Sequence, residues 1–239
     1  MRFTERTYRN KILNHDLLSY QVKVRETDLY ISSDSDLKQE ALRSVHTYRS
    51  HLESYIKSHP DFLTSLTPLG RDELAPDIVR DMLRASRMAG VGPMASVAGA
   101  IAERVGYDLL SITPNVIVEN GGDIFLKSMK EITVGIFAGD SPLSNKIALR
   151  ISPSDTPVGI CTSSATVGPS LSFGRADAVC VKSRSASLAD AAATAIGNVS
   201  KTKADIRKAI SLGSGIKGVL GILIILGAEI GVWGKMELI

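Results

Sequence analysis

The sequence predicts an α+β fold, because helix-like and strand-like patterns of apolar residues occupy different parts of the chain. Apolar residues recur every three or four positions over 36–58, and a further helix is expected over 77–88 after a loop with Pro68, Gly70 and Pro76. Short apolar runs separated by turn residues fill the stretch 115–182. With 239 residues, 44% of them hydrophobic, the chain can bury a large core. We therefore expect residues 1–239 to form a single domain.

The first elements follow from local patterns. Alternation of apolar and polar residues over 19–32 predicts an opening hairpin. Asp36 is placed to cap the helix that ends near Ser58. A further helix is expected over 95–105, because Pro93 suits a first helical turn, where no amide donor is needed.

Strands and two helices are expected in the rest of the chain. The expected strands lie at 115–120, 123–126, 131–137, 146–151, 158–162, 178–182, 219–226, 229–233 and 235–238. The two helices are expected at 187–197 and 201–210.

Charge and composition exclude several classes of protein. Lysine plus arginine number 28 and aspartate plus glutamate 25, so the net charge of +3 indicates no nucleic-acid or membrane-surface partner. The N-terminus has no apolar signal core, and the apolar run 218–228 is far shorter than the ~20 residues that a membrane helix needs. Cys161 and Cys180 are too few for a disulfide scaffold or a four-ligand zinc site. We expect a cytoplasmic protein with no nucleic-acid and no membrane partner.

An acid and a hydroxyl lie one helical turn apart in the segment 188–195. On a helix, Asp190 and Thr194 would lie within reach of one hard cation such as Mg²⁺. A structural alternative stays open: with Ser187 as the helix N-cap, Asp190 completes a capping-box-like arrangement and stabilises only the helix start. Thr194 favours the metal site, since a hydroxyl adds nothing to the helix propensity of an alanine-rich segment.

Two further segments could contact phosphate groups. Gly90 and Gly92 form a loop at the start of a helix, where free amides attract anions, but glycines there also permit close packing of a buried helix. Four hydroxyls follow an expected strand, at Thr162, Ser163, Ser164 and Thr166, although such clusters are often only solvated turns. Cys161 is not expected to be a nucleophile, because all four histidines lie in the first quarter of the chain.

Taken in order, three motifs resemble those of the ApbE family, the FAD:protein FMN transferases. The motifs are Asn120-Gly121-Gly122-Asp123-Ile124, Cys161-Thr162-Ser163-Ser164 and Ala189-Asp190-Ala191-Ala192-Ala193-Thr194-Ala195. The resemblance spans most of the chain and implies an ApbE-like fold of mixed, mostly antiparallel sheets packed with helices. The segment 90–95 departs from the family's lysine-containing loop, so the chain is most similar to an uncharacterised ApbE-related cytoplasmic branch.

The resemblance also implies a ligand, a metal and a reaction. Magnesium would be held by Asp190, Thr194 and the carbonyl of Ala95, and the protein would move FMN from FAD to a hydroxyl of an acceptor protein. The implied contacts to the flavin or a related nucleotide are Gly90, Gly92, Asn120, Gly121, Gly122, Asp123, Thr162, Ser163 and Ser164.

One departure from the family opens an alternative function. No histidine follows His59, so the family's histidine beside the hydroxyl turn is missing, and Asp123 or Asp177 would have to act as the base. The alternative is a noncatalytic flavin- or nucleotide-binding protein that keeps the fold without the transferase chemistry. Exposed sheet edges would also permit a homo-oligomer.

Overall fold

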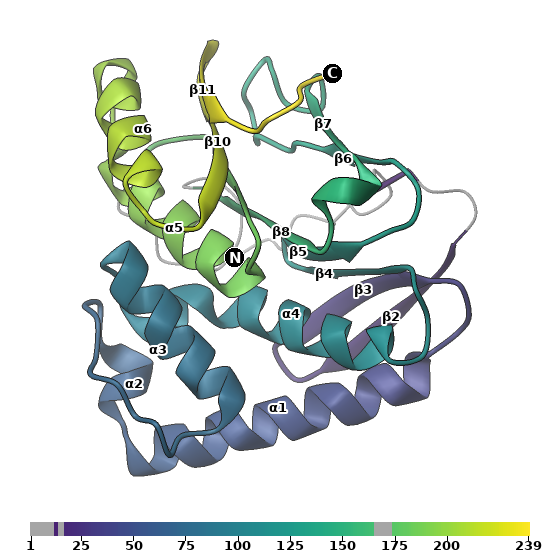
Figure 1. The fold of residues 1–239 in the computed structure, drawn as a ribbon. Coiled ribbons are helices and arrows are strands. Elements are labelled where there is room, and N and C mark those ends of the chain that lie inside the picture. The colour runs from purple at the N-terminus through teal and green to yellow at the C-terminus, as the bar shows by residue number, and fades with distance from the viewer. Residues whose placement is uncertain (1–11, 14–16, 165–173) are drawn as a thin grey trace.

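The computed structural model describes residues 12–13, 17–164 and 174–239, and an eight-stranded sheet forms its centre (Figure 1). The strands of this sheet are β2 (Leu18–Val24), β3 (Thr27–Ser33), β4 (Val116–Asn120), β5 (Asp123–Lys127), β8 (Val158–Ser163), β9 (Ala178–Ser183), β10 (Val219–Leu226) and β11 (Glu229–Gly234). They lie in the order β11-β10-β9-β8-β5-β4-β3-β2, and every neighbouring pair is antiparallel.

Helices cover one face of this sheet (Figure 1). They are α1 (Lys38–Ser58), α2 (Asp61–Thr64), α3 (Asp77–Ala89), α4 (Val97–Leu110), α5 (Ala186–Val199) and α6 (Ile206–Ser214). Helices α4 and α5 pack directly on the central strands, and α1 packs against α4 and β2. A short 3₁₀ turn, η2 (Pro93–Ser96), joins α3 to α4, and a second one, η4 (Lys203–Asp205), precedes α6.

A small three-stranded sheet lies against the other face. Its strands are β1 (Ile12–Leu13), β6 (Ile132–Gly135) and β7 (Ala148–Ile151), in the order β1-β6-β7. The central strands therefore bury both faces. On β4, Val116 and Val118 belong to the core beneath the helices, whereas Ile117 belongs to the core beneath the small sheet. Burial on both sides explains why these strands read as continuous apolar runs.

The structure confirms the α+β class and most of the expected elements, with three corrections. The N-cap of α1 is Leu37 and not Asp36, whose Oδ1 accepts a hydrogen bond from the Lys38 amide at 3.0 Å. Residues 235–238 are not a strand; they return beside β7 through a single bridge between Leu149 and Leu238. The helix expected at 201–210 is divided, because η4 forms a separate turn with a capping box between Thr202 and Asp205. No helix in the described part of the chain combines the length and the hydropathy needed to cross a membrane.

Candidate functional site

Helix α5 carries the acid and the hydroxyl that the sequence singles out. The helix is buried along most of its length, and its partly exposed polar residues are Asp190, Thr194 and Asn198. Their four-residue spacing places them along one side of the helix. The sequence analysis missed Asn198, although the same spacing extends to it.

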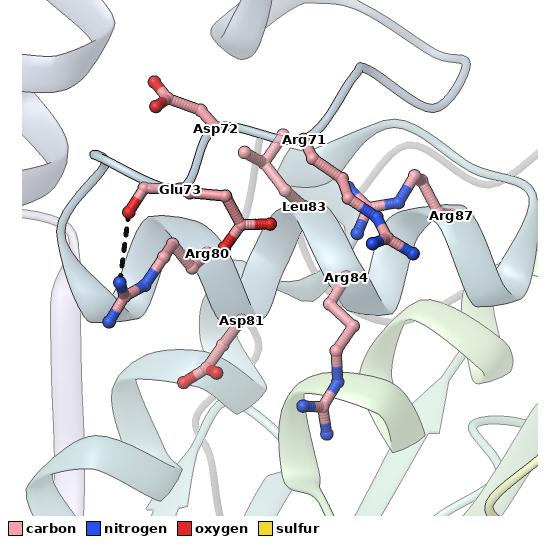
Figure 2. A pocket seen from close by; sticks show the side chains of 8 residues that line it. All are labelled: Arg71, Asp72, Glu73, Arg80, Asp81, Leu83, Arg84 and Arg87. Carbon is pink, nitrogen blue, oxygen red and sulfur yellow. Dashed lines mark hydrogen bonds between the residues drawn. The ribbon is translucent and has the colours of Figure 1, made fainter.

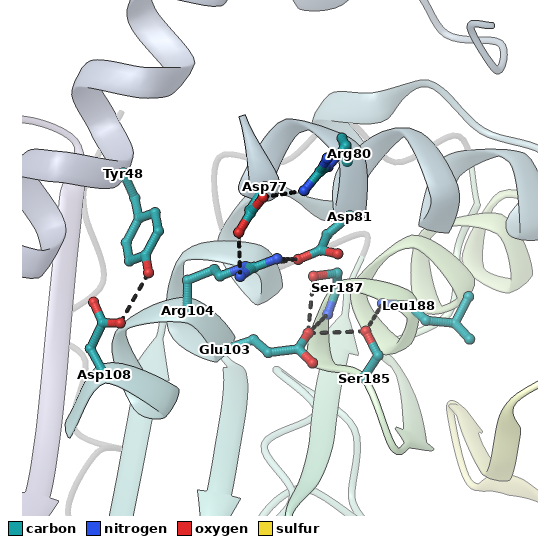
Figure 3. Close-up of polar contacts among 10 residues, drawn as sticks. All are labelled: Tyr48, Asp77, Arg80, Asp81, Glu103, Arg104, Asp108, Ser185, Ser187 and Leu188. Carbon is teal, nitrogen blue, oxygen red and sulfur yellow. Dashed lines mark hydrogen bonds and ion pairs between the residues drawn. The ribbon is translucent and has the colours of Figure 1, made fainter. Parts of the chain in front are cut away.

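The start of α5 shows that the structural alternative, with Ser187 as the N-cap, is wrong. The N-cap is Ser185, whose Oγ accepts a hydrogen bond from the Leu188 amide at 3.3 Å. The amide and the hydroxyl of Ser187 instead donate to Oε2 of buried Glu103 on α4, at 2.9 and 3.0 Å (Figure 3). Glu103 therefore ties α4 to α5, and Asp190 takes no part in capping its own helix.

Asp190 reaches the start of α4 instead. Its Oδ2 accepts a hydrogen bond from the Gly99 amide, in the first turn of α4, at 2.9 Å. The N-cap residue of α4, Ser96, supplies no cap of its own, because its hydroxyl donates to the Pro93 carbonyl at 2.8 Å. The carboxylate thus acts as a cap supplied by a neighbouring helix, where the helix dipole favours negative charge.

The turn between β4 and β5 lies beside the same end of α4. Gly121 and Gly122 have φ angles of 69° and 107°, which a two-residue hairpin turn requires and which glycine adopts most easily. The side-chain amide of Asn120 donates to the Ala98 carbonyl at 3.1 Å. The Thr162 amide on β8 donates to the Gly122 carbonyl at 3.2 Å. Hydrogen bonds therefore join the turn both to α4 and to the end of β8.

A buried acid inside the turn was not anticipated from the sequence. Glu119 is only 3% exposed, and its Oε1 accepts a hydrogen bond from the Gly122 amide at 2.8 Å. This contact fixes the turn conformation, because it uses an amide that the hairpin leaves without a backbone partner. In the sequence, only the position of Glu119 directly before Asn120 could have indicated its role in the turn.

The two glycines of the first loop have structural roles in the fold. Gly90 has a φ of 74° and ends α3, with its amide donating to the Ser86 carbonyl at 2.8 Å. A Cβ atom on Gly92 would lie 1.8 Å from the Ser65 carbonyl oxygen, so close packing requires glycine there. Ala95, by contrast, is partly exposed on η2, which packs against α5.

The hydroxyl cluster lies at the end of β8. Thr162, Ser163 and Ser164 are all partly exposed. A Cβ atom on Gly197 would lie 3.5 Å from Ser163 Oγ, so this strand end runs close to the C-terminal half of α5. Thr166, the fourth hydroxyl of the cluster, falls outside the described residues.

Two carboxylates dominate the electrostatics of this region. Burial and the nearby charge of Asp190 raise the pKa of Asp123 well above its usual range, and burial raises the pKa of Asp190 to about 7. Among the described residues, neither carboxylate forms an ion pair with lysine or arginine. Burial also raises the pKa of Cys161, beside Asp123, well above the usual thiol value, which agrees with the expectation that it is no nucleophile.

The raised pKa of Asp190 predicts a pH-dependent stability. The unfolded chain loses this proton near its usual pKa of 3.8, whereas the folded chain keeps it up to about 7. The folded state therefore binds the extra proton between these values, so its stability falls as the pH rises through this window. Chemical denaturation of wild type and Asp190→Asn should show the wild type losing stability relative to the variant from pH 4 to 7. A difference independent of pH would contradict the assignment.

The described structure brings most of the predicted residues to one place. The start of α4 is the common point, because Asp190 bonds to Gly99 and Asn120 bonds to the adjacent Ala98. Asp177 has a different role: its Oδ2 accepts the Gly227 amide at 2.7 Å and holds the turn between β10 and β11. We call the region of Asp190, Thr194, Ala95, the turn 120–123 and the end of β8 the α5 site.

Comparisons with known proteins agree with this architecture. The family model described as AbpE bacteria matches residues 10–221. A UPF0280 protein of Methanosarcina acetivorans is 42% identical over 217 residues, covering 90% of this chain and 85% of the relative. A UPF0280 protein of Methanococcus aeolicus is 39% identical over 226 residues, covering 92% and 91%.

Solved structures share the fold. The flavinyl transferase ApbE of Pseudomonas stutzeri, in its apo form, matches with a TM-score of 0.61 and 14% identity, covering 91% of this chain and 93% of the other. The flavin transferase ApbE of Vibrio cholerae matches with a TM-score of 0.54 and 14% identity, covering 92% and 97%. At this identity the likeness shows a common fold, while the reaction has to be argued from the residues.

Proposed function

The chain belongs to the family described as AbpE bacteria, and from that premise we propose that it binds FAD together with Mg²⁺ and transfers FMN to a hydroxyl of an acceptor protein. The names of the solved neighbours, flavinyl transferase and flavin transferase, support a flavin substrate. The observation that carries the proposal is the α5 site itself. Segments from α4, α5, the β4–β5 turn and β8 meet there through hydrogen bonds.

The donors of the α5 site suit magnesium. Asp190 supplies a carboxylate whose nearby charge raises the pKa of Asp123, and no described cation forms an ion pair with either residue. The Thr194 hydroxyl makes no hydrogen bond to a described residue, and Ala95 offers a backbone carbonyl on a partly exposed turn. The structure contains no cluster of three or more His, Cys, Asp or Glu side chains within its described ranges. Magnesium needs no such cluster, because it takes most of its ligands from water and substrate phosphates.

The proposed reaction forms one phosphorus–oxygen bond and breaks another. The oxygen of the acceptor hydroxyl forms a bond to the phosphorus of the FMN moiety, and the bond from that phosphorus to the oxygen of the AMP phosphate breaks, so that AMP leaves. Bound magnesium would supply positive charge to the diphosphate. The Gly121 amide would help to orient the phosphates, since the Gly122 amide already donates to Glu119.

Asp123 is the residue that we assign to remove the hydroxyl proton. It is 9% exposed at the start of β5, and burial raises its pKa well above the usual range, which makes this carboxylate a stronger proton acceptor than an exposed one. The described histidines do not offer a competing base, because His46 and His51 lie on α1 and His59 directly follows it.

Incubation with FAD, Mg²⁺ and a serine- or threonine-containing acceptor peptide tests the activity. We expect AMP release and a peptide mass increased by one FMN group, both lost when EDTA replaces Mg²⁺. Asp123→Asn should abolish turnover while it keeps FAD binding, whereas Asp177→Asn serves as a matched carboxylate control. Absence of both AMP and flavinylated peptide would rule out the transferase.

The alternative function is flavin or nucleotide binding without transfer. The placement of the described histidines on and after α1 favours it, because the α5 site then has no imidazole to act as a base. Calorimetry with FAD, FMN and AMP distinguishes the two functions. Magnesium-dependent binding without AMP release would support the alternative, and binding of none would contradict both.

A further inference from the structure

An arginine-rich cavity of about 410 Å³ lies between the loop that precedes α3 and α3 itself (Figure 2). Its lining residues are Arg71, Asp72, Glu73, Arg80, Asp81, Leu83, Arg84 and Arg87. None of them belongs to the α5 site. The volume falls in the range of small-molecule sites, roughly 300–1,000 Å³.

Several charges of this cavity are already used inside the protein. Arg80 pairs with Asp77 and donates to the Glu73 carbonyl at 3.2 Å. Asp81 pairs with Arg104 on α4 (Figure 3). Asp72 accepts a hydrogen bond from the Tyr55 hydroxyl at 3.0 Å. Among the residues that the structure describes, the carboxylates of Asp72 and Glu73 form no ion pair, and neither do three of the four arginines, so the cavity keeps a net positive charge.

The unpaired charge comes from Arg71, Arg84 and Arg87. Among the described residues, none of these side chains forms an ion pair, and Nη1 of Arg87 is buried with no hydrogen-bond partner. Arg87 lies in the last turn of α3, where a cation is favoured by the helix dipole, but that attraction does not satisfy a buried N–H group. Figure 2 shows Arg71 reaching from the loop toward the same side of α3 as Arg87.

We propose that this cavity binds a phosphate group, either as free phosphate or as part of a nucleotide. A phosphate between the neighbouring guanidinium groups of Arg71 and Arg87 would accept hydrogen bonds from both, and a small rotation of the Arg87 guanidinium would give its unpartnered Nη1 an acceptor (Figure 2). The Arg84 guanidinium points away from this pair, so it would contribute charge at longer range only. Guanidinium groups suit this ligand, because their planar forks bind phosphate oxygens in pairs. The proposal does not depend on the flavin reaction, since the two sites share no residue.

The spacing of three arginines in the sequence indicates this site, but the same spacing is also typical of an ordinary solvent-exposed helix face. Arg80, Arg84 and Arg87 follow the spacing i, i+4, i+7 on a predicted helix, so they lie on one face. Only the loop that brings Arg71 over that face turns it into a cavity.

Isothermal titration calorimetry with inorganic phosphate, and separately with AMP, tests the proposal at constant ionic strength set with chloride. We expect binding of at least one ligand, weakened about tenfold or more in Arg87→Gln and in Arg71→Gln, because each variant loses a charge-assisted hydrogen bond to the ligand. Arg71 is exposed on a loop, so its replacement leaves the fold intact even if Arg87→Gln perturbs α3. Arg43→Gln, on α1, is the matched control and should bind normally.

Comparing inorganic phosphate with AMP shows whether the cavity binds free phosphate or the phosphate group of a nucleotide. Tighter binding of AMP than of phosphate, weakened in Arg71→Gln but kept in Asp190→Asn, would assign the rest of the cavity to a nucleoside, and equal binding would assign the cavity to phosphate alone. Binding of neither ligand, or equal affinity in wild type and both cavity variants, would overturn the proposal. Asp190→Asn should bind phosphate normally. A failure of the phosphate proposal can therefore be distinguished from a failure of the proposal for the α5 site.

Discussion

Replacing Gly159 by alanine is expected to lower the free energy of unfolding by about 1–3 kcal/mol, the usual cost of overpacking a filled core. A Cβ atom at Gly159 would lie 2.3 Å from the Cα and 2.6 Å from the amide nitrogen of Ala186. These are backbone atoms in the first turn of α5, so no side-chain rotation can relieve the contact. The helix has to move away from β8.

Movement of α5 is restricted on its other side as well. A Cβ atom at Gly99 would lie 2.3 Å from the Ala186 carbonyl oxygen, so α4 and β8 hold the same turn of α5 between two glycines. Asp190 follows one turn later. The Gly159→Ala variant should therefore also weaken ligand binding at the α5 site, although Gly159 itself is not part of that site.

Urea denaturation of Gly159→Ala and of Gly70→Ala measures this effect against a control. Gly70 is exposed, and a Cβ atom there meets nothing within 4 Å. The control should change stability by no more than about 0.5 kcal/mol. Equal stability of the two variants would contradict the inference that β8 lies too close to α5 to admit a Cβ atom at Gly159.

The elements that could be predicted from the sequence are those whose cause is local. Helix α3 was expected over 77–88 and spans Asp77–Ala89, because an amphipathic pattern and a terminal glycine define it. Strand β10 was expected over 219–226 and spans Val219–Leu226, because glycines and a charged flank bound an apolar run. Turn chemistry placed the β4–β5 hairpin in the same way.

The parts that could not be predicted depend on contacts between distant segments. Asp190 bonds to Gly99, which lies 91 positions earlier, and no periodicity within α5 indicates that partner. The choice of Ser185 over Ser187 as N-cap depends on buried Glu103, whose oxygen binds both amide and hydroxyl of Ser187. The homo-oligomer likewise stays a prediction, because its cause would lie in a second copy of the chain.

In the presence of Mg²⁺, the affinity of Asp190→Asn for FAD is expected to be more than about 100-fold lower than that of wild type. Changes to residues that only support metal ligands already lower metal affinity by about 10–100-fold. The variant separates the two roles of this residue. Its amide oxygen can still accept the Gly99 hydrogen bond that caps α4, while the negative charge that would attract a cation is removed.

Stability and binding should therefore move in opposite directions. At pH 8 the wild type carries a negative charge on the partly exposed Asp190, and its partial burial disfavours that charge, so the free energy of unfolding of Asp190→Asn should equal or exceed that of wild type. Asp190→Ala removes both charge and cap, and it should lose binding together with about 1 kcal/mol of stability.

Thr194→Val supplies the matching test of the hydroxyl, because valine keeps the shape of threonine. It should weaken magnesium-dependent FAD binding and leave binding in the absence of the ion unchanged, since the hydroxyl has no described hydrogen bond to lose. Fluorescence titration of FAD with and without Mg²⁺ measures all three variants. Unchanged affinity in Asp190→Asn, with lower stability only in Asp190→Ala, would assign Asp190 to capping α4 alone and remove the metal site from the α5 site.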